Sequence, residues 1–120
     1  MNQFERRRFL IDTLLEEQPE YKNRIRIPGA EKEQKKLLRS LMNIRWAAPI
    51  TKEFEEIQDE YLKEENARRG IVRIEELTPV QDDLYIWQGD ITRLHAGAIV
   101  NAANSGMTGC YQPCHSCIDN

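Results

Sequence analysis

Apolar residues recur at helical spacing along the first 70 residues or so of the chain. The first stripe consists of Phe4, Leu10, Ile11, Leu14 and Leu15. Because residues three and four positions apart share one face of a helix, this stripe predicts an amphipathic helix. Pro19 ends the pattern, as prolines commonly do.

Two further stripes follow the first. The second begins at Glu31 and consists of Leu37, Leu38, Leu41 and Met42. The third consists of Phe54, Ile57, Tyr61 and Leu62. Thr51 is the expected N-cap of the third helix because acidic residues follow it, and Gly70 is a typical C-terminal stop. We therefore expect residues 1–70 to form a helical extension that packs on the later part of the chain.

The pattern changes after Gly70, where short apolar runs alternate with turn residues. Residues 71–74, 84–87 and 98–100 are the expected strands. The last of these, Ala98-Ile99-Val100, is entirely apolar, which is typical of a strand buried on both faces. Residues 78–83 are expected to be a loop, and residues 91–97 a loop with a short helix.

Composition and charge limit the classes of function. Charged residues make up 31% of the chain, hydrophobic residues 40%, and the net charge is −3, so no basic field for nucleic acid is present. No apolar run approaches the roughly 20 residues that span a bilayer, and Asp12 interrupts the N-terminal apolar stretch. We therefore expect a cytoplasmic protein, in which clustered cysteines indicate metal binding or redox chemistry rather than a disulfide framework.

The most chemically informative segment is residues 100–120, which holds all three cysteines. Thiolate and imidazole groups together suit Zn²⁺. Adjacent residues cannot easily bind one metal, so two ligand sets are open: Cys110, His115 and Cys117, or Cys110, Cys114 and Cys117. Either set leaves a fourth position for substrate or water. The alternatives are a redox pair of Cys114 and Cys117, or buried thiols with no reactivity.

Polar residues that could bind a sugar or a base follow the expected strands. Asn101 and Asn104 come directly after residues 98–100, and the carboxyl ends of strands are where α/β sheets bind ligands. Their amides can bond sugar hydroxyls, although Asn104-Ser105-Gly106 can equally be only a turn. Asp90 can accept hydrogen bonds from a base or ribose, or cap a helix. Asp119 can deprotonate a water, or likewise cap a helix.

Two motifs, taken in order and spacing, resemble the opening half of a macro domain, the ADP-ribose-binding module. They are Gly89-Asp90-Ile91-Thr92 and Ala98-Ile99-Val100-Asn101-Ala102-Ala103-Asn104. The cysteine segment that follows is similar to the zinc-containing microbial branch of that family, in which a helical extension precedes the domain. The resemblance implies an α/β (α+β) fold, with residues 1–70 as the extension and 71–120 as the first strands of a three-layer α/β/α domain.

The resemblance also implies roles for individual residues. Asp90 and the backbone of Ile91 would contact adenine, and Asn104 would hold the distal ribose beside Asn101. Zinc would be bound next to that ribose by Cys110, His115 and Cys117, with Cys114 as a nearby thiol outside the ligand set. Asp119 matches the family's acidic residue near the scissile bond, so Asp119 and Asn104 are the expected catalytic residues.

The implied reaction is the zinc-assisted hydrolysis of mono-ADP-ribose from modified protein side chains. Related members are associated with lipoyl-carrier proteins, which makes such a protein a candidate partner. A module that binds ADP-ribose without cleaving it, or a zinc- or thiol-dependent interaction protein, are the alternatives. Because about fifty residues after Gly70 are too few for a three-layer core, we expect the chain to be a truncated part of a longer protein that is inactive alone.

Overall fold

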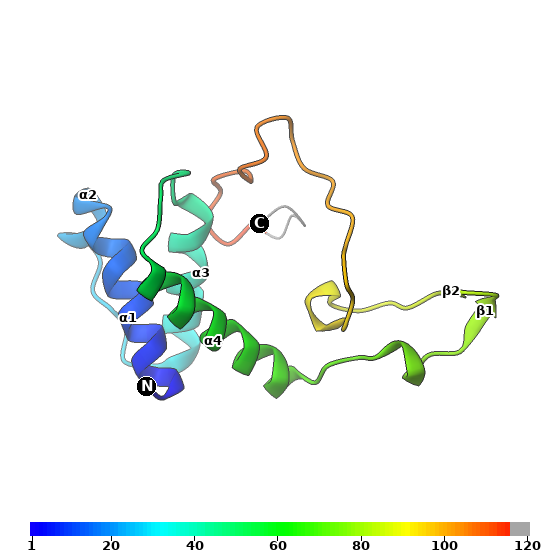
Figure 1. The fold of residues 1–120 in the computed structure, drawn as a ribbon. Coiled ribbons are helices and arrows are strands. Elements are labelled where there is room, and N and C mark those ends of the chain that lie inside the picture. The colour runs from blue at the N-terminus through cyan, green and yellow to red at the C-terminus, as the bar shows by residue number, and fades with distance from the viewer. Residues whose placement is uncertain (116–120) are drawn as a thin grey trace. The chain divides into compact units, whose positions relative to one another are not determined.

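The computed structural model describes residues 1–115, and within these residues it contains four α-helices and a two-stranded sheet (Figure 1). The chain divides into two compact units. Of the described residues, one unit contains Met1–Tyr61 and residues 101–115, and the other contains Leu62–Val100. The expected mixture of helices and strands is present, whereas the three-layer macro-domain architecture stays a prediction.

Helix α1 spans Gln3–Glu16, as the first apolar stripe predicts. Asn2 caps it: the Asn2 side chain accepts the Glu5 N–H at 2.9 Å, and the Glu5 carboxylate accepts the Asn2 N–H at 2.8 Å. The buried apolar residues of the helix are Leu10, Ile11, Leu14 and Leu15. Phe4 differs from the prediction, because its ring is 53% exposed at the edge of the core.

Helix α3 spans Glu31–Ile44 and packs beside α1, as Figure 1 shows, after the short helix α2 (Pro19–Lys22). Leu38 and Leu41 are buried in the core that the two helices share. A polar pair crosses this interface, because the buried Arg7 side chain donates from Nε to Gln34 Oε1 at 2.9 Å. The second predicted helix is confirmed in position and in its inward face.

Helix α4 spans Lys52–Arg69. The Thr51 hydroxyl accepts the Phe54 N–H at 3.1 Å, so Thr51 caps the helix as predicted. Phe54 and Tyr61 are buried, and Gly70 ends the helix with a φ of 86° that favours glycine. No helix in residues 1–115 combines the length and the apolarity needed to cross a lipid bilayer.

The sheet is smaller than predicted and lies partly elsewhere. Strand β1 (Pro79–Gln81) pairs antiparallel with β2 (Leu84–Tyr85). The strand expected over 84–87 therefore forms only at its first two residues. Its partner comes from the segment 78–83, which was wrongly expected to be a loop, because the turn residue Asp83 takes a positive φ of 59° and folds the chain back.

The other two predicted strands do not form in this structure. Within residues 71–74, only Val72 pairs, through a single parallel bridge to Leu94, and Ile74 begins the 3₁₀ helix η1 (Ile74–Glu76). The prediction of a buried strand at 98–100 is wrong for this structure, because Ile99 is 58% and Val100 91% exposed. Among the described residues no segment pairs with 98–100, and an unpaired strand leaves its backbone groups to water.

Candidate functional site

Asp90 lies at a tight turn in the unit of residues 62–100. It is the N-cap of the 3₁₀ helix η2 (Ile91–Arg93). Its Oδ1 accepts the Thr92 N–H at 3.0 Å and the Thr92 hydroxyl at 2.7 Å, and its Oδ2 accepts Arg69 Nη1 at 2.6 Å. The orientation of the Asp90 carboxylate is therefore set by hydrogen bonds within its own turn, and the carboxylate forms an ion pair with Arg69 at the end of α4.

These contacts lower the pKa of the Asp90 carboxyl below its ordinary value. The Thr92 hydroxyl is the largest cause, followed by the Thr92 backbone N–H, and the charges of Arg69 and Arg93 act in the same direction. At neutral pH the group is an anion, which suits an acceptor for the amino group of a base. The two side chains of the Arg69–Asp90 pair are 50% and 41% exposed, so the pair itself adds little stability.

The backbone around this turn is held by a second segment of the same unit. The Val72 N–H donates to the Arg93 carbonyl at 2.8 Å, and the His95 N–H donates to the Val72 carbonyl at 2.9 Å. Arg93 Nε donates to the Gly70 carbonyl at 2.8 Å. His95 is exposed in a loop. These bonds hold residues 93–95, which follow the Asp90 turn, against residues 70–72.

Asn104 organises a turn in the other unit. Its Oδ1 accepts the N–H groups of Gly106 at 2.9 Å and Met107 at 3.1 Å, and its Nδ2 donates to the Gly109 carbonyl at 2.9 Å. The turn that the Asn-Ser-Gly sequence suggests is therefore formed. A Cβ at Gly106 would lie 3.2 Å from Asn104 Oδ1, so a glycine suits this close approach. Asn101 is exposed nearby in sequence.

The backbone from this turn to the cysteine segment is unusually bent. Met107, Tyr111 and Cys114 all have a positive φ, between 52° and 56°, and Gly109 has a φ of 77°. Left-handed conformations cost a non-glycine residue about 1–2 kcal/mol. Contacts elsewhere must compensate for this cost if the segment keeps its conformation.

The bent segment brings Cys110 and His115 together. Cys110 Sγ lies 3.2 Å from His115 Nδ1. Sulfur and nitrogen ligands of one tetrahedral zinc ion lie about 3.6 Å apart, given Zn–S and Zn–N bonds of about 2.3 and 2.1 Å. A small opening of this pair would therefore admit the metal, and thiolate with imidazole is a donor set that zinc prefers.

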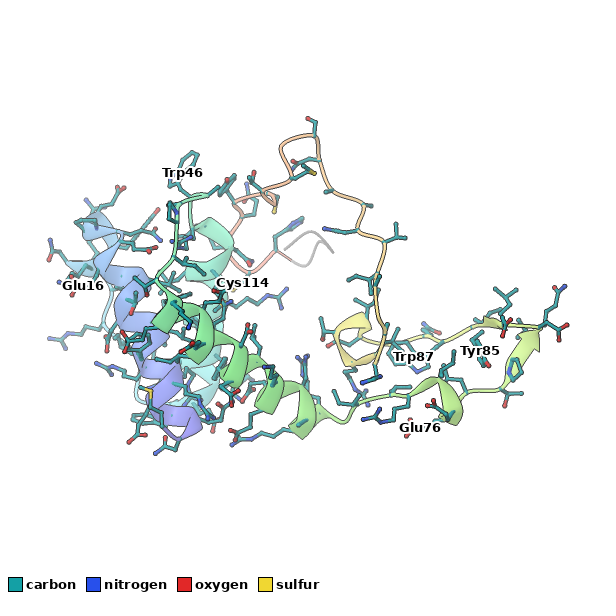
Figure 2. The ribbon with its side chains drawn as sticks, in the orientation of Figure 1. Glu16, Trp46, Glu76, Tyr85, Trp87 and Cys114 are labelled. Atoms are coloured by element: carbon teal, nitrogen blue, oxygen red, sulfur yellow. The ribbon has the colours of Figure 1, made fainter. Side chains whose placement is uncertain are left out.

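Cys114 contacts a different part of the molecule. Its Sγ lies 2.8 Å from the Ser40 hydroxyl, on helix α3 (Figure 2). Of the two open ligand sets, this arrangement favours the one with Cys110 and His115, and it leaves Cys114 as a neighbouring thiol. The third predicted ligand, Cys117, and the predicted catalytic acid, Asp119, lie outside the described residues. Within residues 1–115 no group of three or more potential metal ligands is assembled.

Sequence reasoning missed two residues that contact the predicted site residues. Arg69 pairs with Asp90 from 21 positions away, and Ser40 contacts Cys114 from 74 positions away. No local sequence pattern indicates either contact. Arg69 is an ordinary basic residue at the end of a predicted helix, and Ser40 is a polar residue at a helix position that is expected to be exposed.

Comparison with known proteins gives a consistent result. The chain is 56% identical, over 124 aligned positions and its entire length, to a protein from Treponema medium named protein-ADP-ribose hydrolase. It is 42% identical over 95 positions, or 78% of its length, to a protein of the same name from Staphylococcus aureus strain COL. No family model matches the chain.

The chain spans only part of these relatives, 47% of the Treponema medium protein and 35% of the Staphylococcus aureus protein. It is thus homologous along its whole length to about half of a protein named as an ADP-ribose hydrolase. The relatives' names agree with the activity that the macro-domain resemblance implies.

Proposed function

We propose that this chain is part of a protein-ADP-ribose hydrolase of the zinc-containing macro-domain family. The observation that carries the proposal is the 56% identity over the entire chain to a protein of that name. The 3.2 Å approach of Cys110 Sγ to His115 Nδ1 supports the metal part of the proposal, because a module that only binds ADP-ribose has no need of such a pair.

The substrate we propose is a mono-ADP-ribosylated protein. The Asp90 carboxylate accepts a hydrogen bond from the adenine amino group. Its Oδ2 then accepts from both that amino group and Arg69, and the Ile91 backbone lies beside the base. Asn104 uses one N–H of its amide nitrogen within its turn. The second N–H of that nitrogen is the donor we assign to a hydroxyl of the distal ribose, together with Asn101.

The proposed reaction cleaves the bond between the anomeric carbon and the modified side chain. Cys110, His115 and Cys117 hold zinc, which when bound would orient the ribose hydroxyls, polarise the leaving oxygen or lower the pKa of a water towards about 7. Asp119 takes the proton of the attacking water, whose oxygen bonds to the anomeric carbon as the bond to the protein breaks. The leaving oxygen of the protein side chain keeps the electron pair of that bond and takes up a proton from solvent. A lipoyl-carrier protein is the partner that we propose to test first.

The experiment compares two cysteine variants of the purified full-length protein of which this chain is proposed to be a part. In Cys110→Ser we expect the loss of bound zinc and of the release of ADP-ribose from an ADP-ribosylated protein. In the matched variant Cys114→Ser, whose thiol contacts Ser40 instead, both should be retained. Zinc retained in Cys110→Ser would contradict the ligand set. Zinc binding and ADP-ribose binding without release from any substrate would show a binding module and contradict the hydrolase.

A further inference from the structure

Helix α3 has two opposite faces: one is buried in the helical core, and the other contacts residues 111–115. Positions 34, 38 and 41 lie on one side at helical spacing, and Gln34, Leu38 and Leu41 are all buried against the rest of the helical core. Positions 36, 40 and 43 lie on the other side, about half a turn away. The buried face anchors the helix, which leaves the opposite face rigid and available.

The opposite face of α3 contacts the segment 111–115 at several points. Ser40 Oγ lies 2.8 Å from Cys114 Sγ, and Arg39 Nη2 donates to the His115 carbonyl at 3.2 Å. The Asn43 amide bonds the segment in either orientation: Nδ2 donates to the Gln112 carbonyl at 3.4 Å, or after rotation its oxygen accepts the Cys114 N–H at 3.3 Å.

An aromatic contact lies at one end of the same stretch. The rings of Trp46 and Tyr111 are 5.1 Å apart between centroids and tilted by 34° (Trp46 is labelled in Figure 2). Trp46 is 75% exposed, so this ring is not part of the helical core. The contacts therefore run from residue 111 to residue 115, which is the stretch that places His115 beside Cys110.

We propose that α3 and the residues just after it position the Cys110–His115 pair. The positioning residues are Ser40 and Asn43 on the helix and Trp46 two residues beyond its end. Tyr111 and Cys114 have left-handed backbone conformations that the segment would rarely adopt alone. Holding this backbone against an anchored helix lowers the ordering cost of closing the ligand set. The metal part of this inference rests on the proposed function, whereas the docking of the segment on α3 can be tested without metal.

The docking is tested with a disulfide in the metal-free chain. Ser40→Cys places a thiol where the Ser40 hydroxyl lies 2.8 Å from Cys114 Sγ, close enough for a disulfide after a small shift. The control is Lys32→Cys, on the same helix face but about 12 Å away along its axis. Mild oxidation and peptide mapping should give the 40–114 disulfide as the main product and no 32–114 disulfide. Equal yields, or neither product, would overturn the docking.

The consequence for the metal is tested by zinc titration against a competing chelator. Ser40→Ala, Asn43→Ala and Trp46→Ala should each weaken zinc binding about threefold to tenfold, as the loss of one supporting contact implies. Trp46→Phe should restore most of the affinity, and Lys32→Ala should change nothing. Because all four positions lie outside the buried core, the melting temperature should stay unchanged.

The outcomes separate this inference from the proposed function. Unchanged zinc affinity in all three alanine variants overturns the positioning role and leaves the hydrolase proposal intact. If the parent chain binds no zinc while the 40–114 disulfide forms, the metal part of both proposals is overturned and the docking stands.

Discussion

Asn104 holds its turn through three hydrogen bonds, and its replacement by alanine should open that turn. The bonds join its side chain to the N–H groups of Gly106 and Met107 and to the carbonyl of Gly109. Because the turn is exposed, each bond is assigned the lower limit for a hydrogen bond, about 0.5 kcal/mol. Their sum is about 1.5 kcal/mol, which corresponds to about a tenfold increase in local opening.

Amide hydrogen exchange measures this opening directly. In Asn104→Ala the Gly106 amide should exchange about tenfold faster than in the parent. The Met107 amide should change less, because its N–H also donates to the backbone carbonyl of residue 104 at 3.0 Å, which alanine keeps. Asn104→Asp is the informative control: it keeps an oxygen acceptor for both N–H groups and loses only the donor to Gly109, so the Gly106 amide should exchange only about twofold faster than in the parent. Equal exchange in the parent and in Asn104→Ala would refute the assignment of the turn to the Asn104 side chain.

Three further predictions concern the buried pair, the acidic turn and the core. Gln34→Leu removes the acceptor of the buried Arg7 Nε–H and should cost about 2 kcal/mol in urea unfolding, whereas an unchanged midpoint would contradict the pair. The pKa of Asp90 is lower in the folded chain than in the unfolded chain, where it is about 3.9. The ionised carboxylate therefore stabilises the fold at pH values above the unfolded pKa, and this stabilisation is lost as the pH falls through the folded pKa. Carboxyl NMR titration should show this, and Thr92→Val should raise the midpoint. Leu41→Ala should cost about 2–5 kcal/mol.

The helical part of the fold could be predicted because its signals are local. The apolar stripe around Leu38 and Leu41, the cap at Thr51 and the stop at Gly70 each depend on residues a few positions apart. Such patterns can be recognised without knowing the tertiary contacts of the chain. Phe4 was misplaced because periodicity gives a face but not the edge of the core.

The strands could not be predicted with the same success. A strand needs a partner to bond its backbone, and apolar content alone does not supply one. Ile99 and Val100 are apolar, yet no described segment pairs with them and they are exposed. The chain paired Leu84–Tyr85 with Pro79–Gln81 instead, because the turn at Asp83 brings these two segments together.

The candidate site was predictable in part. The nearness of Cys110 and His115 follows from their spacing of five residues, and the structure brings them to 3.2 Å. The separate contact of Cys114 with Ser40 depends on tertiary packing across 74 positions, which no local pattern encodes. The ligand roles of Asp90, Asn101 and Asn104 stay predictions, as do those of Cys117 and Asp119.

The central claim is that Cys110, His115 and Cys117 bind one zinc ion in this protein. X-ray absorption at the zinc edge of the metal-loaded protein tests it most directly, because sulfur and nitrogen ligands lie at different distances, about 2.3 and 2.1 Å. We expect two sulfur ligands and one imidazole in the parent protein, the same ligands in Cys114→Ser, and no bound zinc in Cys110→Ser. A shell without sulfur, three sulfur ligands without imidazole, or the absence of bound zinc would contradict it.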